Sequence, residues 1–120
     1  MLRLMIVDDS NVIRKQIERL HGNSLFKVVA TASNGQEALD QFDSARPDVV
    51  TMDITMPEMD GLKATRLLLE KDPELRILIV SALADQQTAM EALEIGARGF
   101  LCKPFTESQL KNSLENIIRE

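Results

Sequence analysis

Hydrophobic residues recur along the chain in short blocks that are separated by segments with a different apolar spacing. Five blocks are brief and mostly apolar, as in strands that are covered on both faces: 4–7, 26–32, 48–52, 77–80 and 99–102. The segments between them carry apolar residues every three or four positions, which is the spacing of an amphipathic helix. Strands that alternate with helices predict a parallel sheet with helices packed on both faces.

Capping and breaking residues bound the expected helices. The first helix is expected to follow Ser10 and to end at Gly22, with a buried stripe of Val12, Ile13, Ile17 and Leu20. Capping boxes are expected at 33–36 and 106–109. The helix before Gly96 is expected to begin at Asp85 and to bury Ala89, Ala92 and Leu93. The first, third and fourth strands are the most apolar and are expected in the interior of the sheet, whereas the second is expected at an edge.

The composition of the sequence narrows the classes of protein to which the chain can belong. The 120 residues suit one domain, expected to span residues 1–120. The formal net charge is −5 and the sequence contains no basic block, which argues against tight binding to nucleic acid or to an anionic membrane. No apolar segment approaches the ~20 residues of a membrane span. Cys102 is the single cysteine and is interpreted as a packed strand residue; it permits no internal disulfide, and a cytoplasmic location is expected.

Candidate functional groups stand at the ends of four of the five predicted strands. Asp8 and Asp9 follow the first, Asp53 the third and Ser81 the fourth, and Lys103 follows the fifth. Because the carboxyl ends of parallel strands share one edge of a sheet, these five side chains are expected to converge there.

Three converging carboxylates repel one another, and a hard divalent cation relieves that repulsion. Magnesium takes oxygen ligands and binds through one or two carboxylates together with phosphate. Its charge and that of Lys103 would balance the charges of the three acids. Such a site can accept a phosphoryl group, with Asp53 as the nucleophile and with Ser81 and Lys103 contacting the transferred oxygens.

Each feature taken alone also fits a purely structural role. The acidic pair suits the solvated start of a helix, Ser81 suits a turn, and Lys103 suits a surface charge. The combination of five suitable residue types at these strand ends favours the functional interpretation.

In its ordered motifs the chain resembles the receiver domains of two-component response regulators, above all the stand-alone chemotaxis regulators of the CheY type. The resemblance covers essentially the whole sequence. It rests on four segments: Ile6-Val7-Asp8-Asp9-Ser10, Asp53-Ile54-Thr55-Met56-Pro57-Glu58-Met59-Asp60-Gly61, Val80-Ser81-Ala82 and Cys102-Lys103-Pro104-Phe105.

The resemblance implies a flavodoxin-like (βα)5 doubly wound parallel sheet with strand order 2-1-3-4-5. It implies that Asp53 is the phosphoacceptor, with Ser81 and Lys103 on the phosphoryl oxygens. Magnesium would be bound directly by Asp53, Asp9 and the backbone carbonyl of Thr55, and through water by Asp8. The Lys103-Pro104 peptide would be cis, and Phe100 would change rotamer on activation.

The implied function is that of a signalling switch that catalyses only its own phosphorylation and dephosphorylation. A histidine sensor kinase would supply the phosphoryl group from a phosphohistidine, and the chain, acting as a monomer, would then bind a target protein. The output surface would be formed by the helix near 86–95, the strand 99–102 and the last helix. Flagellar motor control in chemotaxis is the expected response, and a phosphorelay outside chemotaxis is the alternative.

Two positions depart from the best-known chemotaxis members. Phe100 stands where tyrosine is common, and Leu83 is apolar where some members carry an acid or an amide. Because leucine offers no hydrogen bond to an attacking water, Leu83 predicts a longer-lived phosphorylated state.

Other functions known for proteins of this topology fit the sequence less well. A flavin-binding electron carrier needs a phosphate cradle after the first strand, where Asp8 and Asp9 would repel the phosphate. An aspartyl-phosphate hydrolase would need a second acid two residues after the nucleophile, where Thr55 stands. A receiver-like module that is not phosphorylated would normally lack one of the five groups, and all five are present.

Overall fold

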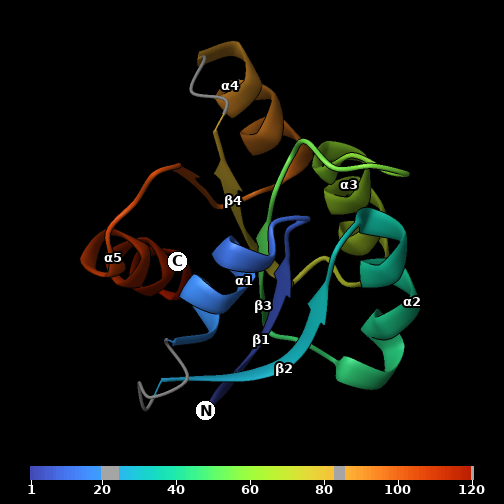
Figure 1. The fold of residues 1–120 in the computed structure, drawn as a ribbon. Helices are drawn as coiled ribbons and strands as arrows, with labels where there is room; N and C mark the ends of the chain where they lie inside the picture. Colours follow the sequence, from blue (N-terminus) through green and yellow to red (C-terminus); the bar gives the residue numbers. More distant parts are fainter. Residues whose placement is uncertain (20–24, 83–85, 120) are drawn as a thin grey trace.

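Strands and helices alternate strictly in the computed structural model, which describes residues 1–19, 25–82 and 86–119 (Figure 1). The strands are β1 (Leu2–Val7), β2 (Phe26–Ala32), β3 (Val49–Met52), β4 (Arg76–Ser81) and β5 (Gly99–Cys102). The helices are α1 (Asn11–Glu18), α2 (Gly35–Ala45), α3 (Gly61–Lys71), α4 (Gln86–Ile95) and α5 (Glu107–Ile118). Among the described residues, no helix is long and apolar enough to cross a membrane.

The five strands form one parallel sheet in the order β2-β1-β3-β4-β5. This order confirms the doubly wound, flavodoxin-like architecture and the interior positions of β1, β3 and β4. The chain leaves β1 in one direction to build β2 and crosses in the other to build β3. In open sheets of this kind the carboxyl ends of the strands at that reversal form the crevice where ligands bind.

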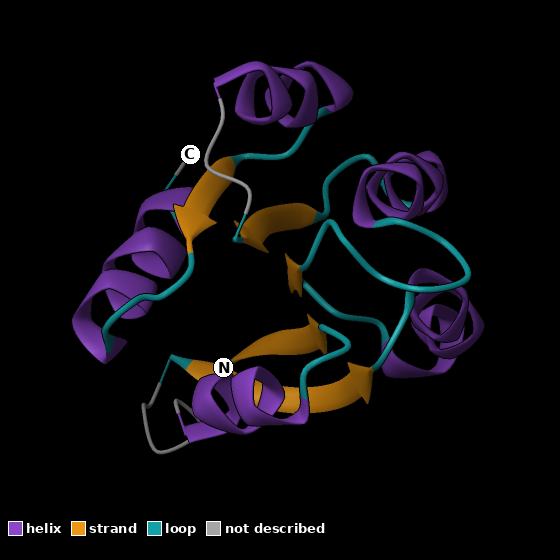
Figure 2. Ribbon diagram, turned by 45° about the horizontal axis from the view of Figure 1, so that its top comes forward, coloured by secondary structure: helices purple, strands orange, loops and turns teal. Residues whose placement is uncertain are grey.

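Side chains that alternate along the interior strands pack into two separate cores. On one face Met5, Val50 and Ile77 contact the apolar residues of α2, α3 and α4. On the other face Leu4, Val49 and Leu78 contact those of α1 and α5. Figure 2 shows the resulting layers, with helices on both sides of the sheet. The near-continuous apolar runs of β1, β3 and β4 are therefore explained by burial on both faces.

Four helices begin at a side chain that accepts a backbone hydrogen bond: Ser10, Asn34, Asp60 and Thr106. The predicted capping box at Thr106 is confirmed, because Gln109 returns a hydrogen bond to the Thr106 backbone. The box predicted at 33–36 is not formed, and the residue that caps the helix lies one position later. Asn34 caps α2, and Ser33 instead bonds the carboxylate of Glu37.

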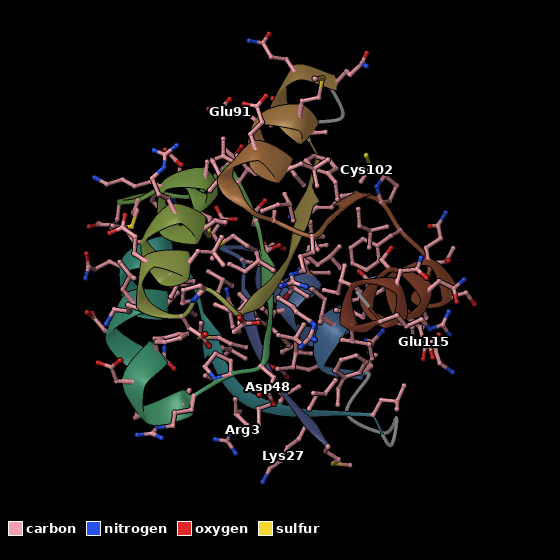
Figure 3. All side chains as sticks on the ribbon, turned by 180° about the vertical axis from the view of Figure 1, so that it is seen from behind. Arg3, Lys27, Asp48, Glu91, Cys102 and Glu115 are labelled. Atoms are coloured by element: carbon pink, nitrogen blue, oxygen red, sulfur yellow. The ribbon has the colours of Figure 1, made fainter. Side chains whose placement is uncertain are left out.

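Three residues that were expected to pack inside are exposed. Val12 is 74% exposed because the buried stripe of α1 runs through Ile13 and Ile17, four residues apart. Leu93 is 51% exposed because α4 buries only Ala92 against the body of the protein. The third is Cys102, which lies at the end of the edge strand β5 with its side chain in solvent (Figure 3). The predictions for Leu20, Gly22, Leu83 and Asp85 fall outside the described residues.

Candidate functional site

Backbone hydrogen bonds continue one residue past the ends of three strands and position the candidate groups. The Asp8 N–H donates to Ala32 O at 3.0 Å, and the Asp53 N–H donates to Val7 O at 2.9 Å. The Lys103 N–H donates to Ser81 O at 2.9 Å. The sheet therefore holds these backbones at one edge, as the parallel order predicted.

The three predicted carboxylates come together at this edge. Asp8, Asp9 and Asp53 each offer an oxygen, and these oxygens all lie within 4.8 Å of one another. Asp8 and Asp53 are only 1% and 4% exposed, whereas Asp9 is exposed. The cluster is therefore buried at Asp8 and Asp53, which directly follow strands of the sheet, and is open to solvent at Asp9.

Lys103 joins the cluster from the end of β5. Its Nζ lies 2.8 Å from Asp8 Oδ2 and 3.4 Å from Asp53 Oδ1. The Lys103-Pro104 peptide is cis, as predicted. Ser81, the last residue of β4, is buried and pairs in the ladder with Cys102, next to Lys103. The structure thus brings the lysine onto two of the three acids and places Ser81 at the end of β4, the strand beside β3, which Asp53 follows.

Burial and the neighbouring charges change the pKa of Asp53. The pKa of Asp53 is raised from 3.8 to about 6, chiefly by burial and then by the neighbouring Asp8 and, more weakly, Asp9. Lys103 opposes this rise through its charge and its hydrogen bond. A cation bound between the carboxylates would favour the ionised form of Asp53 by the same reasoning.

The shifted pKa makes the stability of the metal-free chain depend on pH. Below about pH 4 the Asp53 carboxyl is protonated in both the folded and the unfolded chain. Between about pH 4 and 6 only the folded chain keeps the proton, so the free energy of unfolding falls as the pH rises. We expect Asp53→Asn to stabilise the chain by about 2–3 kcal/mol at pH 8 and by little at pH 4. Urea denaturation in the presence of a chelator measures this, and an equal gain at both pH values would contradict it.

The donor set of the cluster suits magnesium. Carboxylate oxygens are hard ligands, and Mg²⁺ uses one or two of them while keeping several waters. Asp9 is the exposed member and leaves room for those waters. Thr55 lies two residues beyond Asp53 in the same loop, and the role of its carbonyl as a ligand stays a prediction.

Gly61 fixes the loop after Asp53, a role that the sequence indicated only as a turn signal. A Cβ atom on Gly61 would lie 1.9 Å from the carbonyl oxygen of Asp53. The Gly61 N–H also donates to Ile54 O at 2.8 Å. The first residue of α3 therefore packs directly against the backbone of Asp53, an approach that only glycine permits.

Gly61→Ala is expected to displace Asp53 and to destabilise the fold by about 1–3 kcal/mol, because the backbone that it meets cannot rotate away. Gly99→Ala is the control, since its Cβ would meet side-chain methyl groups of Ile117 and Leu78, at 2.9 and 3.1 Å, and not the backbone. Urea denaturation and the rate of phosphoryl uptake from acetyl phosphate should both separate the two variants. Equal effects would show that the Gly61 contact has no special importance.

Phe100, the predicted switch residue, is half-buried on β5. It lies opposite Ile79 of β4 and packs against the core that α2, α3 and α4 cover. Leu83 lies outside the described residues, so its effect on the lifetime of the phosphorylated state stays a prediction.

Comparisons with known proteins agree with this geometry. The family model for the response regulator receiver domain matches residues 4–115. The chain is 44% identical over 115 residues to the chemotaxis protein CheY of Listeria monocytogenes, covering 96% of this chain and 97% of that protein. It is 36% identical to CheY of Thermotoga maritima, with 96% of each chain covered.

Solved structures share the fold. The chain superposes with a TM-score of 0.93 on a chain in the crystal structure of the CheX-CheY complex with BeF3 and Mg²⁺ from Borrelia burgdorferi. The two are 31% identical, and the match covers 98% of this chain and 89% of that one. A second match, with a TM-score of 0.89 and 29% identity, is chemotaxis protein CheY4 of Vibrio cholerae, with 98% of each chain covered.

Proposed function

This chain belongs to the response regulator receiver domain family, whose members are phosphorylation-activated signalling switches, and we propose that Asp53 is its phosphoacceptor. The observation that carries the proposal is the convergence of three carboxylates with Lys103, whose Nζ lies 3.4 Å from Asp53 Oδ1. Asp53 is buried, and burial together with the neighbouring acids raises its pKa. With a pKa of about 6 it is mostly ionised at neutral pH and can act as a nucleophile.

Receiver domains bind Mg²⁺ at an acidic pocket, and we assign that role here to the cluster. Asp9, Asp53 and the Thr55 carbonyl would bind the ion directly and Asp8 through water. When bound, the ion supplies positive charge that offsets the charge on the transferring phosphoryl oxygens. The support for this assignment is the donor chemistry and the mutual approach of the three carboxylates.

The chemistry of phosphoryl transfer follows from the placement of the side chains. A carboxylate oxygen of Asp53 attacks the phosphorus of a phosphohistidine on a sensor kinase, the P–N bond breaks, and the imidazole leaves. Lys103 pairs with an oxygen of the transferred group, and the Ser81 hydroxyl donates a hydrogen bond to another. Attack of water on the acyl phosphate later returns Asp53 to its free form, so the chain catalyses only its own modification.

Acetyl phosphate tests the proposal without a kinase. Incubation of the full chain with acetyl phosphate and Mg²⁺ should add one phosphoryl group, detected by intact mass. A chelator should prevent the addition, because the three carboxylates then repel the incoming phosphate. Equal uptake with and without Mg²⁺ would refute the proposed metal site.

The proposed output is protein binding through α4, β5 and α5. Ser81 precedes α4 and Lys103 precedes α5, so both elements are connected to groups on the phosphoryl oxygens. Phosphorylation adds charge and strong acceptor oxygens, which should draw Ser81 inward. The half-buried ring of Phe100 can then turn inward, which gives the surface two discrete states. A target such as a flagellar switch protein would bind one of those states.

Phe100→Ala is expected to uncouple the output surface from the site. Beryllofluoride, which mimics the phosphoryl group, should shift the amide NMR signals of 81–93 and 99–110 in the unaltered chain. In Phe100→Ala these shifts should shrink, whereas those at Asp8, Asp9 and Asp53 should persist. Leu101→Ala is the matched control, because Leu101 lies on the same strand and packs against the opposite core. Full shifts across α4 and α5 in Phe100→Ala would contradict the switch.

A CheY is complexed with CheX in the Borrelia burgdorferi structure, and the full-length relatives of this chain include chemotaxis proteins. These likenesses support chemotaxis as the response that this chain controls, with a histidine kinase as its phosphodonor. They do not favour a flavin-binding carrier.

A further inference from the structure

Arg14 of α1 is joined to the acidic cluster through the backbone of Asp8. Its Nη1 donates to the Asp8 carbonyl oxygen at 2.6 Å, and its Nη2 donates to Asn11 Oδ1 at 3.2 Å. The side chain is half-buried, and the hydrogen bond from a charged donor is stronger than a neutral one. Arg14 is therefore fixed at two points, one of them in the loop that carries the metal-binding acids.

The other polar atoms of Asp8 are also held in place. Its N–H donates to Ala32 O, and its Oδ1 accepts from the Ser10 N–H at 2.9 Å. Its Oδ2 faces the ammonium of Lys103 at 2.8 Å. The contact with Arg14 fixes the remaining atom, the carbonyl oxygen. That oxygen belongs to the peptide group that joins Asp8 to Asp9, so its orientation sets the direction in which the backbone enters Asp9.

Asp9 depends on this orientation more than its neighbours do. Asp8 and Asp53 are buried, and packing confines their side chains. Asp9 is exposed and approaches two other carboxylates, which repel it. The orientation of the 8–9 peptide therefore limits where the Asp9 carboxylate can lie.

The positive charge of Arg14 also acts on Glu37 at the start of α2. Hydrogen bonds from the backbone and the side chain of Ser33 lower the pKa of Glu37, and the positive charge of Arg14 lowers it further. Lys103 reaches the same cluster from the end of β5, so Asp8 contacts Arg14 through its carbonyl oxygen and Lys103 through its carboxylate.

We propose that Arg14 is a positioning residue for the magnesium site: it holds the Asp8–Asp9 peptide so that the Asp9 carboxylate is preorganised to bind the metal ion. This inference rests on the proposed function. Arg14 does not touch the phosphoryl group, so its loss should weaken metal binding and leave the transfer step itself unchanged. Residues that orient metal ligands in this way typically contribute about 10–100-fold to metal affinity.

The test is a magnesium titration of the full chain, followed by amide NMR, for the unaltered protein and for Arg14→Gln and Lys15→Gln. Lys15 is the next residue of α1 and is exposed, so Lys15→Gln removes the same charge without the contact. We expect Arg14→Gln to raise the Kd for Mg²⁺ about tenfold and Lys15→Gln to leave it nearly unchanged. Equal Kd values in the two variants would overturn the proposal.

A second readout separates positioning from damage to the fold. With acetyl phosphate, the Mg²⁺ concentration for half-maximal phosphorylation should rise in Arg14→Gln, and the rate at saturating Mg²⁺ should match that of the unaltered chain. A lower rate at saturation with an unchanged Mg²⁺ requirement would overturn the proposal. If the unaltered chain binds no Mg²⁺, the proposed metal site itself fails, which is a different result.

Arg14→Lys covers the case in which Arg14→Gln does not fold. Lysine keeps the charge and one donor group but cannot reach the Asp8 carbonyl and Asn11 with a planar fork. Its Kd should therefore lie above that of Lys15→Gln, and below that of Arg14→Gln where both can be measured. A Kd equal to that of Lys15→Gln would show that the geometry of Arg14 is immaterial.

Discussion

Asp53→Asn is expected to abolish phosphoryl uptake from acetyl phosphate while leaving the fold intact and more stable above about pH 6. The side-chain amide has the shape of the carboxyl group but no anionic oxygen that can attack phosphorus. The buried neighbours of Asp53 are retained, and the replacement removes one of three repelling charges. Intact mass after incubation with acetyl phosphate and Mg²⁺ measures the loss.

Glu58→Gln is the control for this experiment. Glu58 is an exposed acid in the same loop, so the change removes an equal charge outside the cluster. It should accept phosphoryl groups as the unaltered chain does. Continued uptake by Asp53→Asn would show that another residue is the acceptor.

The second large effect is expected from Asp9→Ala, which should lose Mg²⁺ binding and with it the Mg²⁺-dependent uptake. Asp9 is exposed, so its side chain contributes little to packing, and its removal relieves repulsion on Asp53. The fold should therefore survive. Titration with Mg²⁺ should shift the amide signal of Asp53 in the unaltered chain and leave it in place in the variant.

Asp43→Ala removes one negative charge from the exposed face of α2 and serves as the control. Its Mg²⁺ titration should match that of the unaltered chain. Unchanged binding in Asp9→Ala would mean that the remaining carboxylates suffice, and the proposed ligand set would then be wrong.

Patterns that repeat along the chain allowed most of the fold to be predicted. Strands that are apolar throughout, such as 77–80, must be covered on both faces, and this requirement alone placed β1, β3 and β4 in the interior. The rule that parallel strands share one edge correctly predicted that Asp8, Asp53 and Lys103 lie together. The order of the strands came from the family resemblance, because periodicity does not specify neighbours.

The features that were missed depend on contacts between segments that lie apart along the chain. Val12 and Leu93 are apolar, but that alone does not determine which side of a helix packs against the sheet. Both residues are exposed. The sequence indicated Gly61 only as a turn residue, because its close contact with the Asp53 backbone forms only when α3 packs in place. The hydrogen bond from Arg14 to the Asp8 carbonyl could not be predicted either, because every residue has a backbone carbonyl and the sequence does not indicate which one a side chain contacts.

The measurement that tests the central claim most directly is the chemical location of the phosphoryl group on the unaltered chain. After incubation with acetyl phosphate and Mg²⁺, reduction with borohydride converts an aspartyl phosphate to homoserine, and peptide mass analysis then locates the altered residue. The account predicts a single altered residue, at position 53. Alteration at Asp8, Asp9 or any other position, or no alteration at all, would contradict it.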